Sequence, residues 1–154
     1  MRAILTRVKS ASVTIDGEVV GSIGKGFLIL LGVGPGDTEK ECRCLAEKAL
    51  GLRVFTDEND KMNLGLEAVD GQVLVVSQFT LYGNCRTGRR PSFAEAAGPE
   101  LGEQLYEKFL EICTELGYPP QHGRFGADMQ VESINDGPVT LILDTDQLMN
   151  TPRR

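Results

Sequence analysis

The sequence has few of the residues that carry the commonest catalytic and metal-binding chemistries. Among its 154 residues there is no tryptophan and one histidine, His122. A Ser-His-Asp or Cys-His site would have to be built on that single imidazole, and His122 stands in a predicted turn, where a solvated ring is the usual outcome. No GxGxxG follows a predicted strand, and no GxxxxGK[ST] occurs. The sequence therefore disfavours metal and nucleotide chemistry, and no cofactor is expected.

The four cysteines also lack a metal-binding or disulfide pattern. No CxxC pair exists among Cys42, Cys44, Cys85 and Cys113. Cys42 and Cys44 fall two apart on a predicted helix and so point to different faces. A zinc site or a disulfide framework is therefore disfavoured. We interpret the cysteines as reduced thiols that pack as small hydrophobic side chains.

Long apolar runs are missing as well. The longest, Phe27 to Leu31, has the length of a strand and not of a membrane span. A charge recurs at Arg7 before any signal-peptide core is complete. We therefore expect a cytoplasmic protein without membrane contact. The length suits one domain, which would bury roughly 68–70% of the surface of its unfolded chain.

Positive charge is in deficit over the whole chain, with 22 acidic and 16 basic residues and a net charge of −6. That balance counts against capture of nucleic acid by a broad basic surface. Local capture stays open, because Arg86, Arg89 and Arg90 lie within five positions with no acidic residue between them. The cluster is either a phosphate contact or a solvated surface loop, and charge alone favours the loop.

Hydrophobic periodicity and turn signals divide the chain into strands and helices. Thr38 and Glu41 have the spacing of a capping box at a helix start, and Gly51 is placed to end that helix. Asp16-Gly17 is typical of a two-residue hairpin turn. The predicted strands are 12–15, 18–20, 26–33, 52–55, 72–82, 129–134 and 139–143, and the helices are 38–51 and 100–116.

These elements predict an α+β domain. We expect a curved or barrel-like mixed β-sheet covered by two main α-helices, with the strand order left open. The last two strands are predicted to pair through the turn Asn135-Asp136-Gly137-Pro138. Residues 1–146 are expected to form the domain and residues 147–154 a mobile C-terminal tail.

Two segments are unusual for purely structural pieces. Ser77-Gln78-Phe79-Thr80-Leu81-Tyr82 places polar residues at the end of a very apolar strand, where a rigid backbone can hold a site against solvent. Fraying of the strand into a loop is the equally weighted alternative. Asn135-Asp136-Gly137-Pro138-Val139-Thr140 contains an X-Pro bond, the only kind expected in cis. From the residues alone, a hairpin turn is the favoured interpretation of that segment.

These two motifs together resemble the signatures of the D-aminoacyl-tRNA deacylase family, the second being similar to its Gly-cisPro element. Arg89-Arg90-Pro91-Ser92-Phe93 and Gly123-Arg124-Phe125-Gly126-Ala127 also match the family pattern, as do Ala11-Ser12-Val13 and Gly24-Lys25-Gly26. The resemblance covers about residues 1 to 146. Thr87 and His122 depart from it at positions where the family often has Lys and Thr.

The resemblance implies a hydrolase for proofreading in translation, which cleaves the carboxylic ester of D-aminoacyl-tRNA without metal or cofactor. It implies a homodimer with each site at the subunit interface. Ser77, Gln78, Phe79 and Thr80 of one subunit would line the catalytic site, and Gly137-Pro138 of the other would exclude L-aminoacyl esters by collision. Arg86, Arg89 and Arg90 would contact the tRNA.

A threonine without a general base is a poor nucleophile. We therefore expect Thr80 and the backbone near Phe79 to position groups and to stabilise the oxyanion, with Gln78 and Ser77 shaping the site. The vicinal hydroxyl of the terminal adenosine would then activate water.

Other functions stay open at this point. A deacylase that also accepts Gly-tRNA would differ only in how open the pocket is, because achiral glycine should pass a filter against L side chains. A non-catalytic tRNA-binding module and a stand-alone relative of synthetase editing domains are the further alternatives.

Overall fold

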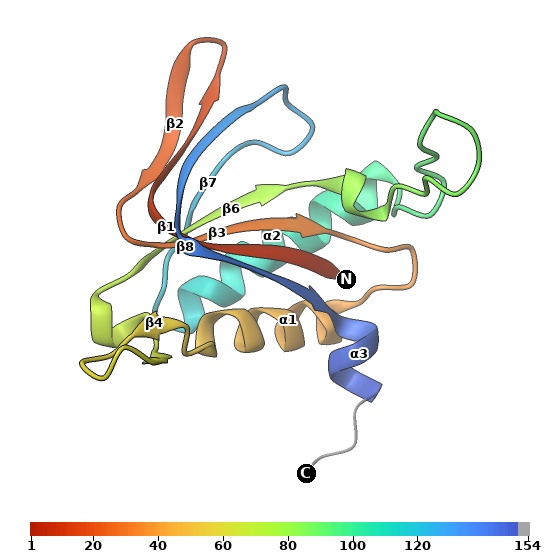
Figure 1. The fold of residues 1–154 in the computed structure, drawn as a ribbon. Helices are drawn as coiled ribbons and strands as arrows, with labels where there is room; N and C mark the ends of the chain where they lie inside the picture. Colours follow the sequence, from red (N-terminus) through yellow and green to blue (C-terminus); the bar gives the residue numbers. More distant parts are fainter. Residues whose placement is uncertain (151–154) are drawn as a thin grey trace.

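The computed structural model describes residues 1–150, which fold around one curved mixed sheet (Figure 1). The strands follow the order β2-β1-β3-β6-β7, and β8 pairs with the other edge of β1. β3 runs parallel to β6, and β6 parallel to β7, while the remaining pairs are antiparallel. The bounds are β1 Arg2–Ile15, β2 Glu18–Ile23, β3 Gly26–Gly32, β6 Gln72–Ser77, β7 Gln121–His122 and β8 Gln130–Asp144.

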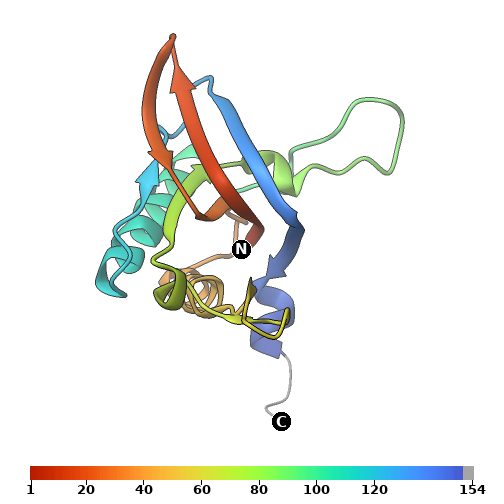
Figure 2. The same cartoon turned by 60° about the vertical axis from the view of Figure 1, so that its left-hand side comes forward.

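The two ends of this strand order come together, so the sheet nearly closes. Gly21 on β2 lies so close to β7 that a Cβ atom on it would be 2.8 Å from the backbone oxygen of His122. Figure 2 shows the resulting curvature, with the β1–β2 hairpin folded over toward β6 and β7. The predicted barrel-like mixed sheet is confirmed.

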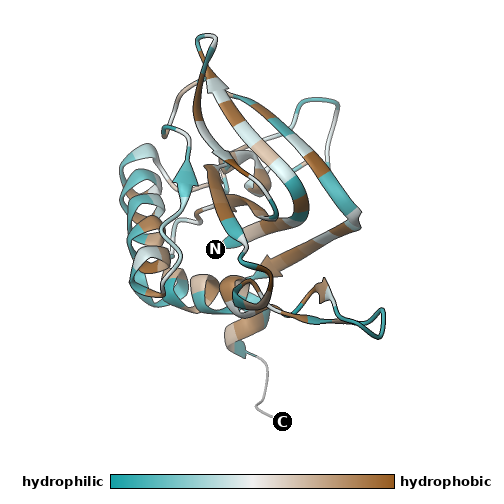
Figure 3. Cartoon of the chain, turned by 90° about the vertical axis from the view of Figure 1, so that its left-hand side faces the viewer, coloured by the Kyte–Doolittle hydropathy of each residue, from teal (hydrophilic) through white to brown (hydrophobic). Residues whose placement is uncertain are grey.

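Two long helices cover one face of the sheet, as predicted. The helix α1 (Glu39–Gly51) begins with a complete capping box between Thr38 and Glu41, and α2 (Pro99–Glu115) is the second. Their apolar faces, brown in Figure 3, turn toward the sheet. This main core contains Leu5, Phe27, Ile29, Leu45, Ala46, Val75, Tyr106, Phe109 and Ile112.

A second, smaller core lies on the opposite face of the central strands, where the hairpin curls over. It includes Val8 and Val13 of β1, and Leu28, Leu74 and Val76 of the parallel pair. Because β3 and β6 are buried on both faces, their sequences are continuous apolar runs and do not alternate.

The hairpin turn is also confirmed. Asp16 and Gly17 have φ angles of 50° and 80°, as a type I′ turn requires at both central positions. The strand before it is much longer than predicted, since β1 begins at Arg2. The strand expected at 52–55 was wrong in extent: β4 comprises Phe55–Thr56 and pairs with β5 (Met62–Leu64), and the short 3-10 helix η1 (Glu67–Val69) follows.

The predicted tail was wrong for residues 147–150. These residues complete a helix, α3 (Thr145–Asn150), which lies beside α1. Thr145 is 1% exposed and Leu148 packs against the main core. The tail was predicted because these residues lie near the end of the chain, but the apolar contacts of Leu148 hold them against the domain. Residues 151–154 lie outside the described residues.

All four cysteines are free thiols in the structure. Cys85 is exposed, so the interpretation of the cysteines as packed hydrophobic side chains was wrong for that residue. Cys42 and Cys113 are fully buried, and burial raises the pKa of each thiol to about 12. Both therefore stay protonated and act as small hydrophobic side chains. No helix within residues 1–150 is long and apolar enough to cross a membrane.

Candidate active site

The polar motif at the end of β6 forms a tight turn and not a continued strand. β6 ends at Ser77, opposite Leu31 of β3, and the N–H of Gln78 still donates to the carbonyl oxygen of Leu31 at 2.7 Å. The chain then turns into the 3-10 helix η2 (Phe79–Tyr82). The strand predicted to reach Tyr82 was therefore too long. The parallel strands β3 and β6 are rigid, and they place η2 at the edge of the sheet where β6 ends.

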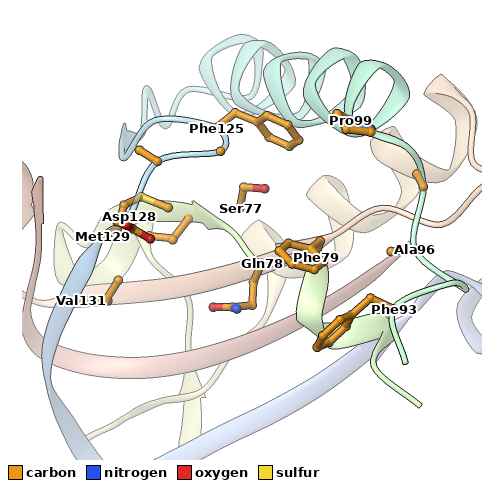
Figure 4. Close-up of a pocket in the computed structure, with 14 residues that line it drawn as sticks. Ser77, Gln78, Phe79, Phe93, Ala96, Pro99, Phe125, Asp128, Met129 and Val131 are labelled. Atoms are coloured by element: carbon orange, nitrogen blue, oxygen red, sulfur yellow. The ribbon is translucent and has the colours of Figure 1, made fainter. Parts of the chain in front are cut away.

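A cavity of about 530 Å³ opens beside this turn. Its walls come from the end of β6, η2, the loop before α2 and the segment between β7 and β8 (Figure 4). Most of the lining is apolar or aromatic. The lining residues are Val76, Ser77, Gln78, Phe79, Phe93, Ala96, Ala97, Pro99, Phe125, Gly126, Ala127, Asp128, Met129 and Val131.

Aromatic rings shape the mouth of this cavity. Phe79 is 55% exposed and meets Phe93 edge to face, with ring centroids 5.2 Å apart. Phe125 contacts Tyr106 of α2, with centroids 6.1 Å apart. In Figure 4, Ser77 lies between Phe125 and Phe79. A mainly apolar cavity with a few polar side chains is the usual form of a ligand-binding site.

The predicted catalytic residues divide between the cavity and its rim. Ser77, Gln78 and Phe79 line the cavity, while Thr80 is exposed next to them and is outside the lining. The side-chain amide of Gln78 donates a hydrogen bond to the hydroxyl of Thr80. That bond fixes the Thr80 side chain relative to the cavity.

No imidazole stands beside Thr80 among the residues described. His122 lies on β7, where its Nδ1 is 2.7 Å from the carbonyl oxygen of Gly123. The only titratable side chain of the cavity lining is Asp128. The arrangement therefore offers Thr80 no neighbouring histidine to act as its base.

The Gly137-Pro138 segment is a bulge inside one long strand, so the predicted hairpin turn was wrong. Both flanking halves of β8 pair with β1 and not with each other. Thr6 faces Thr140 and Val8 faces Asn135, so two steps along β1 correspond to five steps along β8. The extra residues protrude from the ladder. The Gly137-Pro138 peptide bond is cis.

Residues of the same motif hold this bulge in place. The side-chain oxygen of Asn135 accepts a hydrogen bond from the N–H of Val139 at 3.0 Å. Its amide nitrogen donates to the hydroxyl of Thr140, also at 3.0 Å. The Asn135 side chain thus bridges the two ends of the bulge. Gly137 has a φ of 122°, in a region that residues with a side chain rarely adopt.

Arg7 of β1 supports the bulge from below, and sequence reasoning missed it. The side chain is 8% exposed and donates from Nε to the carbonyl oxygen of Asp136 at 3.0 Å and from Nη1 to that of Val54 at 2.6 Å. The Asp136 carboxylate completes the contact at 3.6 Å. Gly137 lies directly over the guanidinium group, since a Cβ atom there would be 2.5 Å from Nη2. The available signal was that Arg7 follows Ala3 and Leu5 at alternate positions of β1, on the face that turns inward.

The Gly137-Pro138 bulge does not line the cavity of its own chain. Both residues are exposed on β8, which pairs only with β1 within residues 1–150. The two motifs that the sequence singled out are therefore not brought together in one cavity of a single chain.

The arginine cluster occupies a protruding loop. Backbone hydrogen bonds between Asn84 and Ser92, at 2.7 and 2.9 Å, close the loop at its base. Arg86, Arg89 and Arg90 are exposed beyond that bridge, and none of the three forms an ion pair within the described part of the chain. Figures 1 and 2 both show the loop extending away from the body of the molecule. No group of three or more His, Cys, Asp or Glu residues within residues 1–150 could hold a metal ion.

Proteins of known family resemble this chain over nearly its whole length. A D-aminoacyl-tRNA deacylase of Desulfatibacillum aliphaticivorans is 58% identical over 145 residues, which cover 94% of this chain and 99% of that protein. One from Geobacter sulfurreducens is 54% identical, covering 94% and 95%. The family model described as D-Tyr-tRNA(Tyr) deacylase matches residues 4–144. The chain therefore belongs to the D-Tyr-tRNA(Tyr) deacylase family.

Two solved structures have the same fold. A protein described as the c-Myc DNA unwinding element binding protein superposes with a TM-score of 0.88 at 41% identity, covering 94% of this chain and 98% of that one. A structure described as a probable eukaryotic D-amino acid tRNA deacylase has a TM-score of 0.81, covering 92% and 97%. At 16% identity, the second likeness shows the fold alone.

Proposed function

We propose that this protein hydrolyses the ester bond of D-aminoacyl-tRNA and spares the L esters. The observation that carries the proposal is the cavity lined by Ser77, Gln78 and Phe79, because it lies within the residues that the D-Tyr-tRNA(Tyr) deacylase family model matches. Its test is the release of free amino acid from D-Tyr-tRNA by the purified protein. A protein that only binds tRNA would leave the ester bond of D-Tyr-tRNA uncleaved.

The cavity suits the terminal adenosine of a tRNA better than it suits an amino acid side chain. Its aromatic and apolar walls, with Phe79, Phe93 and Phe125, favour stacking against a flat base. An enzyme that accepts many D side chains cannot recognise the side chain itself. Binding the constant adenosine would leave the aminoacyl group near the start of η2.

The chemistry then follows from the turn. The first N–H groups of a helix lack intrahelical partners, so the backbone at Phe79 and Thr80 can donate to an oxyanion. Water attacks the ester carbon, the bond to the ribose oxygen breaks, and the proton of the water ends on that oxygen. The vicinal ribose hydroxyl would activate the water, because no histidine lies beside Thr80.

Thr80 should behave as a positioning group. We expect Thr80→Ser to keep most of the activity, because its hydroxyl can still accept from Gln78. Thr80→Ala should lower kcat by about 10-fold, far less than the roughly 10⁴-fold or greater loss that follows removal of an obligatory nucleophile. The measurement is single-turnover deacylation of D-Tyr-tRNA. A trapped covalent aminoacyl-Thr80 species would contradict this role.

We also propose that two copies of the chain complete each site. The exposed Gly137-Pro138 bulge of one copy would reach the cavity of the other and exclude L-aminoacyl esters by collision. An apolar row supports a paired surface: Leu30, Ile4 and Ile142 are aligned across β3, β1 and β8, and Ile142 is 76% exposed. Gly-tRNA should also be hydrolysed, because glycine has no side chain to collide.

The protruding loop is proposed to contact tRNA phosphates. Replacing Arg89 and Arg90 together by alanine should weaken tRNA binding and lower the slope of log K against log salt by about 1 to 2, because up to two fewer phosphate contacts are made. Binding measured over a series of salt concentrations checks this, with Arg43→Ala on α1 as the control. An unchanged slope would contradict the contact.

A further inference from the structure

Arg2, at the start of β1, makes three contacts, two of them to η2 and one to the end of β8. Its Nη1 donates to the carbonyl oxygen of Leu81 at 3.2 Å. Its guanidinium carbon lies 4.4 Å from the centroid of the Tyr82 ring. Its Nε donates to the Asp144 carboxylate at the end of β8, also at 3.2 Å. One side chain therefore connects η2 to two strands of the sheet.

Arg2 contacts the C-terminal end of η2, which is anchored in the protein, while the N-terminal end of η2 is exposed. Tyr82 is 9% exposed and fits over two glycines of the β3 end: a Cβ atom on Gly34 would be 2.9 Å from its hydroxyl, and one on Gly32 would be 3.3 Å from the ring. Burial raises the pKa of Tyr82, so the ring stays neutral beneath the guanidinium group. Phe79 and Thr80, at the opposite end of η2, are exposed.

We propose that Arg2 is a positioning residue that holds η2 so that Phe79 and Thr80 stand in the geometry that hydrolysis requires. The inference rests on the proposed function and adds a residue outside the cavity to it. The hydrogen bond to the Leu81 carbonyl and the stacking on the Tyr82 ring together hold η2 against the start of β1. Asp144 keeps the planar guanidinium group aligned for both contacts.

The expected effect is on catalysis and not on stability. The Arg2 and Asp144 side chains are 39% and 19% exposed, and ion pairs of this exposure contribute little to folding. Loosening η2 would instead misplace the donors to the oxyanion. Displacements of about 1 Å in such groups can lower a rate by up to about 100-fold.

The chain provides a matched control. Arg43 on α1 pairs with Glu115 on α2 at the same distance, 3.2 Å, and the two side chains are 41% and 48% exposed. Neither residue lines the cavity. Arg43→Gln therefore removes an equivalent ion pair without releasing the turn.

The experiment compares Arg2→Gln, Arg2→Lys, Asp144→Asn and Arg43→Gln. For Arg2→Gln we expect kcat on D-Tyr-tRNA to fall by about 10-fold or more with KM within about twofold, since tRNA contacts remain and the loss lies in the transition state. Arg2→Lys and Asp144→Asn should lie between Arg2→Gln and the wild type. Arg43→Gln should keep wild-type kcat.

A second readout does not depend on activity. Amide hydrogen exchange of the 78–84 segment reports the bonds from Leu81 and Gly83 to Gln78 and Thr80. We expect faster exchange there in Arg2→Gln and none of that change in Arg43→Gln. Wild-type kcat in Arg2→Gln, or unchanged exchange in that segment, would overturn the inference. An inactive wild-type protein would instead overturn the proposed function, and the exchange data would still decide whether Arg2 holds η2.

Discussion

Replacing Gly137 by alanine is expected to slow the hydrolysis of D-aminoacyl-tRNA strongly. The added methyl group would stand 2.5 Å from Nη2 of Arg7, and that guanidinium group is fixed by the carbonyl oxygens of Val54 and Asp136. The φ of 122° at Gly137 would cost an alanine about 1–3 kcal/mol more. The bulge must therefore move, and we expect kcat/KM to fall by about 100-fold or more because the misplaced loop obstructs the site.

Single-turnover deacylation, together with the melting temperature, measures this effect. Gly117→Ala is the control, because Gly117 has a φ of 96° and a Cβ atom added to it would meet nothing within 4 Å. It therefore introduces an unfavourable φ without a collision and outside the cavity lining. Equal activities of the Gly137→Ala variant and the wild type would show that the bulge has no part in the site.

A charge in the apolar row of Leu30, Ile4 and Ile142 is expected to prevent the proposed pairing of two copies and to lower the activity strongly. Ile142 is 76% exposed and lies opposite Ile4. Ile142→Asp would place a carboxylate in the apolar surface through which we propose that two copies pair, where an unpaired buried charge is strongly unfavourable. We expect a monomer in sedimentation velocity and a fall in kcat/KM of about 100-fold or more, the scale of losing a positioned part of the site.

Val19→Asp provides the matched control, since Val19 is 63% exposed on β2, outside the apolar row. It should leave both the mass and the rate unchanged. A fully active Ile142→Asp monomer would contradict a site completed by a second copy. A wild-type protein that is itself monomeric and active would contradict it as well.

The sequence was most informative where local chemistry decides the structure. The capping box of Thr38 and Glu41 and the Asp16-Gly17 turn depend on neighbours within a few residues, so the first helix and the hairpin could be predicted. The continuous apolar runs of β3 and β6 likewise allowed both strands to be predicted.

Long-range pairing was beyond local patterns. Asn135 to Pro138 has the composition of a hairpin turn, but β1 is long enough to pair with both flanking segments, so the turn became a bulge in β8. Similarly, α3 is stabilised because Leu148 packs against the main core. In both cases the residues in contact are far apart in the sequence.

The candidate site was open to sequence reasoning only in part. Polarity at a strand end singled out the segment that contains Ser77, Gln78 and Phe79, and the family resemblance implied their role; all three line the cavity. The supporting arginines could not, because Arg7 contacts Val54, 47 positions away, and Arg2 contacts Leu81, 79 positions away. Only the folded chain brings such groups beneath the bulge and the turn.

The most direct test of the account is deacylation of D-Tyr-tRNA, L-Tyr-tRNA and Gly-tRNA, measured side by side with the same wild-type protein. All three substrates share the terminal adenosine, and the two tyrosyl esters differ only in the configuration of the amino acid. We predict rapid release of D-tyrosine, measurable release of glycine, and no release of L-tyrosine above the uncatalysed rate. Equal rates on the D and L esters would contradict the chirality filter, and no release from any of the three would contradict the proposed hydrolase.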